Sequence, residues 1–229
     1  MSAKYKFTGK EKQFFGATLK QIVCVKEFSI KGLLEIQKGD IGGWIESEGN
    51  LSQEGACWIQ ENAQVYGNAV VCEDAQVYGN AQVYGNAVVS DKAVVGGNAI
   101  VYGYAQVSGN ARVSRHAQVY DNARVYRHAI VGDNAVVGGN AAVRGNAQVS
   151  SNAAVGGHAK VSGNADVKGG AIITKNNDIV WISNIGSECG TFTAYTTRDE
   201  IYCTRGCFEG TIKEFENAVN NTHGDSKIG

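Results

Sequence analysis

Apolar and small residues recur at a fixed spacing of six along the middle of the chain. Valine or isoleucine stands at every sixth position from Ile59 to Ile173, and alanine at every sixth position from Ala63 to Ala171. A Gly-Asn pair most often precedes the alanine, as at Gly67-Asn68. Such regularity predicts an array of equivalent structural units.

A period of six fits neither the 3.6-residue period of a helix nor one long alternating strand. Short strands joined by sharp corners satisfy it, with one strand in each repeat. Valine and alanine then point inward, and the residue between them, such as Gln64, points to solvent, because side chains alternate along a strand. We expect the Gly-Asn pairs to form the corners, since both residue types tolerate left-handed backbone dihedrals.

This pattern resembles the hexapeptide repeat of left-handed parallel β-helix proteins, in which an aliphatic residue is followed four positions later by a small one. The resemblance covers about half of the chain. It implies an all-β fold, namely a single left-handed parallel β-helix of triangular coils. Three hexads make one coil in that family, so residues eighteen apart stack vertically, and the hand of the helix follows from the resemblance alone.

The N-terminal residues depart from the repeat. We interpret residues 1–56 as an N-terminal strand cap with an imperfect first coil, because Ile45 and Leu51 are again six apart. Trp44 and Trp58 are expected to plug the open end of the prism, as large apolar side chains would do.

The β-helix is expected over residues 57–185, since Ile179 and Ile185 keep the six-residue register. Residues 186–229 are interpreted as a C-terminal cap. A hairpin is expected around Arg198-Asp199, and Thr211 followed by Glu214 is the capping-box signature of a helix start.

The segments Gly39–Ser52, Cys207–Thr211 and Thr222–Asp225 resemble a family of hexapeptide-repeat proteins of the YdcK type. That family occurs in phages, prophages and bacteria and includes proteins assigned as acyltransferases. The resemblance implies a phage or prophage origin more than any reaction, because fold and activity are separable.

Sorting the array by a spacing of eighteen separates three faces. One face, here called the tyrosine face, carries a vertical ladder and uncharged neighbours: Tyr66, Tyr84, Tyr102, Tyr120, Ile100 and Val136. An uncharged face with aromatic residues is typical of a packing surface. Because related β-helices are usually trimers, we expect this face to form a homotrimer interface. The alternative is a ladder that stacks only on itself in solvent.

The ions lie on the other two faces, among them Arg112, Asp166 and Lys168 on one. The face that carries Arg124, Arg144 and Lys160 is here called the arginine face. We predict a ligand site on this face. The arginine guanidinium groups suit phosphate, and the tyrosine ring suits a base. The site residues are Arg124, Tyr126, Arg127, His128 and Arg144. Arg115 is less available, since Asp133 stacks on it. The alternative is a solvated charged edge that keeps the prism soluble.

Three histidines, His116, His128 and His158, stand where asparagine normally precedes alanine. Hexapeptide acyltransferases use a histidine as general base, and His128 is the candidate under that alternative, with coenzyme A as cofactor. No insertion interrupts the array and no acid stacks on His128, so a structural role at the corner is favoured over catalysis.

The six cysteines are scattered along the chain, which indicates reduced thiols. Cys189, Cys203, Cys207 and His223 lack the spacing of a zinc knuckle, so no metal is expected.

The balance of 21 basic against 22 acidic residues argues against DNA binding. Without an apolar run of membrane-spanning length or a signal peptide, we expect a cytoplasmic protein, in the bacterial host if phage-encoded. We predict a non-catalytic homo-oligomeric binding protein without cofactor, a counter-defence factor that sequesters an anionic or nucleotide ligand or blocks a host defence protein. An acetyl-coenzyme A dependent acyltransferase and a structural assembly module are the alternatives.

Overall fold

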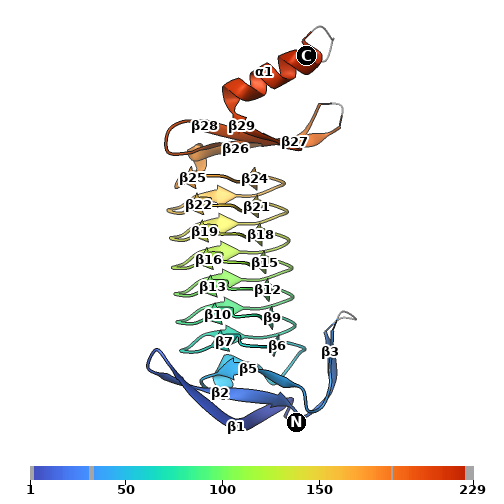
Figure 1. Cartoon of the computed structure of the whole chain (residues 1–229), viewed down its shortest axis with the longest axis vertical. Helices are drawn as coiled ribbons and strands as arrows, with labels where there is room; N and C mark the ends of the chain where they lie inside the picture. Colours follow the sequence, from blue (N-terminus) through green and yellow to red (C-terminus); the bar gives the residue numbers. More distant parts are fainter. Residues whose placement is uncertain (1–2, 31–33, 187, 225–229) are drawn as a thin grey trace.

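The computed structural model describes residues 3–30, 34–186 and 188–224. It shows a tall prism of stacked coils with a β-hairpin across one end and a small sheet across the other (Figure 1). The two termini lie at opposite ends of the prism (Figure 1). The prediction of one parallel β-helix within an all-β fold is confirmed.

The tyrosine face belongs to a ten-stranded sheet. Its strands, in spatial order, are β1 (Tyr5–Phe14), β2 (Ala17–Cys24), β5 (Ile41–Ile45), β7 (Gln64–Val65), β10 (Gln82–Val83), β13 (Ile100–Val101), β16 (Gln118–Val119), β19 (Val136–Val137), β22 (Ala154–Val155) and β25 (Ile172–Ile173). From β5 onward the pairing is parallel, and each strand lies eighteen residues after its neighbour from β7 on. This is the stacking that three hexads per coil predict.

The other two faces are a six-stranded and a seven-stranded parallel sheet. The arginine face comprises β8 (Val70–Val71), β11 (Val88–Val89), β14 (Gln106–Val107), β17 (Arg124–Val125), β20 (Ala142–Val143) and β23 (Lys160–Val161). The third face comprises β6 (Trp58–Ile59), β9 (Gln76–Val77), β12 (Val94–Val95), β15 (Arg112–Val113), β18 (Ile130–Val131), β21 (Gln148–Val149) and β24 (Asp166–Val167).

The interior of the prism is made of the inward valines and alanines. Ala117 and Val119 have no exposed surface, and the same holds for nearly every equivalent position. Each buried valine contributes about 1.5–3 kcal/mol of burial free energy. Backbone hydrogen bonds of 2.6–3.2 Å, such as Val88 N to Ala105 O at 2.9 Å, join successive coils. The small alanine leaves room for a valine in each of three walls.

The corners differ from the expectation in one respect. Positive φ falls on the first residue of each corner pair, as at Gly67 (φ 65°), Asp91 (φ 56°) and Arg127 (φ 65°), and not on the asparagine that follows. The asparagines instead stack and bond one another, for example Asn80 Nδ2 to Asn98 Oδ1 at 3.1 Å. The asparagine is therefore suited to this position by the ladder that its side chain forms. The prediction that it adopts a left-handed backbone dihedral was wrong.

Acidic residues at the left-handed corner position have a physical reason. The N–H of this position has no backbone partner in the neighbouring coil, so a carboxylate one coil below accepts it. Gly109 N donates to Asp91 Oδ2 at 2.8 Å, and Ser151 N donates to Asp133 Oδ2 at 3.0 Å. Each such bond satisfies a donor that the corner would otherwise leave to water.

The N-terminal cap closes the lower end of the prism. The hairpin of β1 and β2 pairs antiparallel with β5, and a second hairpin joins β3 (Phe28–Ile30) to β4 (Leu34–Ile36). The 3₁₀ turn η1 spans Glu48–Asn50. The prediction that Trp44 and Trp58 plug the open end was wrong for both. Trp58 is buried against Tyr5 and Phe28, but it pairs with the outward Gln76 and so lies under the cap on the outer side of β6. Trp44 faces outward from β5, with Lys12 Nζ 4.3 Å from its ring centre.

The upper cap is a four-stranded antiparallel sheet of β26 (Ile179–Ile185), β27 (Gly190–Thr196), β28 (Ile201–Arg205) and β29 (Phe208–Thr211). The predicted hairpin and the capped helix α1 (Ile212–His223) are both present. The helix extends away from the prism beyond the sheet (Figure 1). Ile179 is buried like the inward residues of the array, but the strand that begins with it, β26, pairs antiparallel with β27. The prediction that the array extends to residue 185 was therefore wrong.

Side chains of the upper cap close the last coil. Thr204 Oγ1 donates to Asp166 O at 2.7 Å and Thr196 Oγ1 donates to Ile172 O at 2.6 Å. Asp166 N donates to Thr193 Oγ1 at 3.1 Å, and the 3₁₀ turn η2 (Asn176–Asp178) supplies Asn176 Oδ1 to Lys160 N at 2.9 Å. The open strand edges are thereby satisfied, which guards the array against edge-to-edge association.

The tyrosine ladder is a continuous stack. Ring centres of Tyr66, Tyr84, Tyr102 and Tyr120 lie 4.9, 5.1 and 5.2 Å apart, with interplanar angles of 8–12°. Above it, a Cβ placed at Gly138 would lie 2.5 Å from the ring of Tyr120. The ladder therefore ends on a glycine because the last ring leans over that position.

An alkaline titration should reveal the ladder. Burial, with the neighbouring Tyr84 as a smaller cause, raises the pKa of Tyr66 from 10.0 to about 12. The folded state then holds this phenol neutral, so its contribution to stability is complete below pH 10 and is lost as the pH rises towards 12. Denaturation at a series of pH values measures this decline. The Tyr66→Phe variant should flatten it, and an equal decline in that variant would contradict the assignment.

Candidate functional site

A groove runs across the upper half of the arginine face. Arg124, Ala142 and Lys160 are the outward residues of β17, β20 and β23 and pair in register. Neighbouring strands of a sheet are about 4.8 Å apart, so the backbones of Arg124 and Lys160 are about 10 Å apart. Ala142 between them is short and forms the floor, with a cation on either side.

The sides of the groove come from neighbouring columns. Tyr126 and Arg144 lie on one side, where Arg144 Nη1 donates to the Tyr126 hydroxyl at 3.3 Å. Asn122 and Asn140 line the other side, and the depression encloses about 380 Å³. Tyr126 is half-buried, and its bond to Arg144 holds that guanidinium beside the floor. The site thus combines fixed donors with an aromatic ring.

No carboxylate of the described residues pairs with the three cations of the groove, Arg124, Arg144 and Lys160. Among the residues that the structure describes, ion pairs join Arg115 to Asp133 at 2.8 Å and Lys168 to Asp166 at 2.6 Å, and neither involves the groove. The first pair was predicted from the spacing of eighteen. Arg124, Arg144 and Lys160 are all exposed, so their donors are available to an anion. Guanidinium groups suit the paired oxygens of phosphate or carboxylate.

Two of the five predicted ligand residues lie outside the groove. Arg127 and His128 form the corner after β17 and are both exposed, and neither is among the lining residues. A corner side chain leaves the prism at an angle to the face, whereas the outward strand positions lie over it. The structure brings together Arg124, Tyr126 and Arg144 and adds Lys160, Asn122 and Asn140, which the spacing of eighteen could have identified.

The other histidines lie at different corners. His116 continues an asparagine ladder, with Nε2 3.1 Å from Asn98 Nδ2. The backbone of His158 donates to Thr174 O at 3.2 Å, and that of His128 donates to Gly145 O at 2.9 Å. The geometry brings no two of these imidazoles to one place, and His116 has a structural contact that its corner position accounts for.

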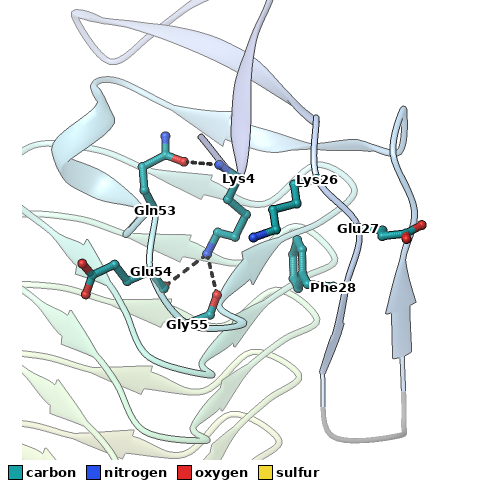
Figure 2. A pocket seen from close by; sticks show the side chains of 7 residues that line it. All are labelled: Lys4, Lys26, Glu27, Phe28, Gln53, Glu54 and Gly55. Atoms are coloured by element: carbon teal, nitrogen blue, oxygen red, sulfur yellow. Dashed lines mark hydrogen bonds between the residues drawn. The ribbon is translucent and has the colours of Figure 1, made fainter. Parts of the chain in front are cut away.

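A larger cavity of about 510 Å³ lies beside the N-terminal cap (Figure 2). Lys4, Lys26 and Phe28 line it together with Gln53, Glu54 and Gly55. The Lys4 ammonium is buried and donates to the carbonyl oxygens of Cys57, Gly55 and Glu54 at 3.0, 3.3 and 3.4 Å. Its donors are used in holding the cap to the first coil, so the cavity is less suited to an anion than the groove.

The cysteines are free thiols in the described residues. Cys203 is buried in the upper cap, whereas Cys189 and Cys207 are exposed. The described residues contain no group of three or more histidine, cysteine, aspartate or glutamate side chains placed to hold a metal. The side chain of His223, the fourth residue of the zinc alternative, lies outside the described part.

Comparison with known proteins gives two findings. The family model of the YdcK β-solenoid repeat matches residues 63–79, 81–97, 105–116 and 117–133. The chain is also 37% identical over 62 residues to a protein named "Uncharacterized acetyltransferase YdcK" from Escherichia coli strain K12. That match covers 27% of this chain and 18% of the relative, so the chain spans less than a fifth of that relative's length. None of the described helices is long and apolar enough to cross a membrane.

Proposed function

We propose that this chain, whose repeat array resembles the β-solenoid of the YdcK hexapeptide-repeat family, is a non-catalytic binding protein. It self-associates through the tyrosine face as a homotrimer and holds an anionic ligand, with a nucleotide as the preferred class, in the groove of the arginine face. The fold supplies a rigid wall, and the outward residues of that wall supply the specificity.

The observation that carries the proposal is the unpaired charge over Ala142. Three cations line a floor made of a single methyl group, whereas Arg115 and Lys168 elsewhere in the array pair with Asp133 and Asp166. A phosphoryl group seated over Ala142 would contact Arg124 and Lys160 from below and above and Arg144 from the side. The Tyr126 ring beside it gives a base or another planar group a surface to pack on.

The double variant Arg124→Ala, Arg144→Ala tests the groove. A hydrogen bond to a charged group contributes about 1.5–3 kcal/mol, so losing two should weaken binding by at least about a hundredfold. Titration calorimetry with inorganic phosphate, a nucleoside diphosphate and coenzyme A measures the affinity. We expect the thermal transition to be unchanged, because both side chains are exposed.

The matched control is Arg112→Ala on the third face. Arg112 is likewise the exposed outward residue of its strand, so its removal changes the net charge without touching the groove. Equal affinity for every probe in the wild type and the double variant would overturn the proposed pocket. A similar loss of affinity in Arg112→Ala would show that the effect comes from the overall electrostatic field of the protein and not from the groove.

The biological role that fits this proposal is sequestration. A phage-encoded oligomer that binds a nucleotide signal of a host defence system removes the signal without reacting with it. Blocking a host defence protein through an exposed face is the other form of this role. If the protein acts by blocking a host protein, no small anion should bind. The same titrations therefore distinguish blocking from sequestration.

A second candidate is acetyl-coenzyme A dependent acyl transfer, which the printed name of the YdcK relative favours. His128 is then the general base, since it is exposed next to the arginine face. The array from β6 to β25 contains no projecting loop, and asparagines at 110 and 146 lie below and above His128, so no acid orients the ring. Release of free coenzyme A that His128→Ala abolishes, with the fold intact, would establish the enzyme and contradict a purely binding role.

A further inference from the structure

The turn between β1 and β2 carries an unusual residue. The two-residue loop is Phe15-Gly16, closed by the pair Phe14 and Ala17, with φ of 44° at Phe15 and 86° at Gly16. A loop with positive φ at both central positions normally has asparagine or aspartate followed by glycine, because other side chains clash with the backbone there. Phenylalanine at the first position therefore keeps the backbone in a conformation that its side chain disfavours.

Phe15 is also placed where its side chain buries little surface within one chain. It is 87% exposed, more than any other large apolar side chain that the structure describes. Asparagine at the same position would remove both the backbone strain and the exposed ring. The stability of the single subunit therefore does not account for Phe15, and strain kept at an exposed position points to a role in binding.

The position of the turn says where that role lies. The Phe15 ring packs edge-on against Phe14 at 4.7 Å, and Phe14 packs edge-on against Tyr66 at 5.8 Å. Tyr66 is the first ring of the tyrosine ladder, so six aromatic rings form one continuous chain of contacts from the turn to Tyr120. The turn is thus an extension of the tyrosine face beyond the end of the prism.

We propose that Phe15 is the anchor with which one subunit grips the tyrosine face of a second copy of this chain. The inference rests on the proposed self-association through that face. A second copy is the partner that the charges fit, because the outward residues from Gln64 to Ile172 on this sheet are uncharged and two such faces meet without repulsion. If two subunits met through their arginine faces instead, Arg124 and Lys160 of one subunit would face the same cations of the other and repel them.

The nearby lysines do not oppose this docking. Lys12 Nζ lies 4.3 Å from the ring centre of Trp44 and 5.9 Å from that of Phe14, and Lys20 Nζ lies 5.3 Å from that of Phe7. Both ammonium groups are thus held over aromatic rings of the same subunit.

The test is Phe15→Gly. Glycine accepts φ of 44° without strain, so the thermal midpoint should stay or rise. Burial of a phenylalanine side chain contributes about 1.5–3 kcal/mol, so the dissociation constant of the oligomer, measured by sedimentation equilibrium, should rise about tenfold to a hundredfold. The matched control is Arg127→Gly, which relieves φ of 65° at a corner away from the tyrosine face and should leave association unchanged.

The outcomes separate this inference from the proposed function. Unchanged association in Phe15→Gly, together with a monomeric Tyr102→Glu variant, would overturn the anchor and leave the self-association standing. A wild type that is monomeric at every concentration would overturn both. Should the glycine variant fail to fold, Phe15→Asn also removes the ring and gives the turn its usual Asn-Gly sequence, so the same rise in the dissociation constant is expected. Vesicle binding that the wild type shows and Phe15→Gly loses, with unchanged mass, would assign the tip to a lipid surface and contradict a second copy.

Discussion

Replacing Ala117 with leucine is expected to destabilise the β-helix by about 3 kcal/mol. Ala117 has no exposed surface and lies where three walls of the prism meet across a narrow interior. Hydrogen-bonded coils above and below prevent the backbone from moving apart, because each strand is paired on both sides. The added atoms must therefore displace valines from their rotamers.

Chemical denaturation of this variant against Ala142→Leu measures the effect. Ala142 carries the same residue at an outward position, so the same added atoms meet solvent there and stability should change by less than about 0.5 kcal/mol. The Ala142→Leu variant also fills the floor of the groove and should weaken anion binding. Equal stability of the two variants would show that the interior tolerates volume, contrary to a close-packed prism.

Replacing Tyr102 with glutamate is expected to reduce the protein from an oligomer to its 24.3 kDa monomer. Tyr102 lies in the middle of the ladder between Tyr84 and Tyr120, at 5.1 and 5.2 Å. In the proposed interface the new carboxylate would be buried without a partner, which costs about 3–5 kcal/mol at each copy of the contact. Mass in solution, measured by light scattering, reports the change.

Tyr104→Glu is the matched control for this prediction. Tyr104 lies in the same coil, two residues further on, but at a corner where it is 64% exposed. Its replacement introduces the same charge without entering the ladder, so the oligomer should persist. An unchanged mass in Tyr102→Glu would show that the tyrosine face is not the interface, and that the ladder serves only its own stacking.

The regular part of this protein could be predicted almost residue by residue. A period of six sustained over twenty repeats allows one arrangement of inward positions, and Val65, Ala69 and their equivalents are all buried. The corners were harder. A Gly-Asn pair does not show by composition which member has positive φ, since both tolerate it, and only the structure shows that the asparagine forms the ladder.

The candidate site was predicted in part for a related reason. Stacking by eighteen placed Arg144 over Tyr126, and the two are hydrogen-bonded. Sequence proximity made Arg127 and His128 appear to belong with them, although corner residues do not lie over the face. Lys160 was assigned to the arginine face but not to the site, because the importance of the small Ala142 beneath it becomes evident only once the groove is seen.

The caps were the least predictable part. Ile179 keeps the register of the array, yet alanine is replaced by Asn177 and Ser183, and the chain leaves the prism to pair antiparallel with β27. The hydroxyl groups that close the last coil, such as Thr204, leave no pattern in the sequence, because each bonds a strand edge far away along the chain. Contacts of this kind follow from the shape of the end and have no local signature.

Native mass spectrometry of the freshly purified protein, alone and with inorganic phosphate, nucleotides and coenzyme A, tests the central claim most directly. We predict an oligomer that binds one phosphate-containing ligand per subunit, and we predict that Arg124→Ala, Arg144→Ala loses the ligand while keeping the oligomer. An oligomer that binds none of these probes, or a double variant that binds them as the wild type does, would contradict the proposal that this β-helix acts by holding an anion in the groove of its arginine face.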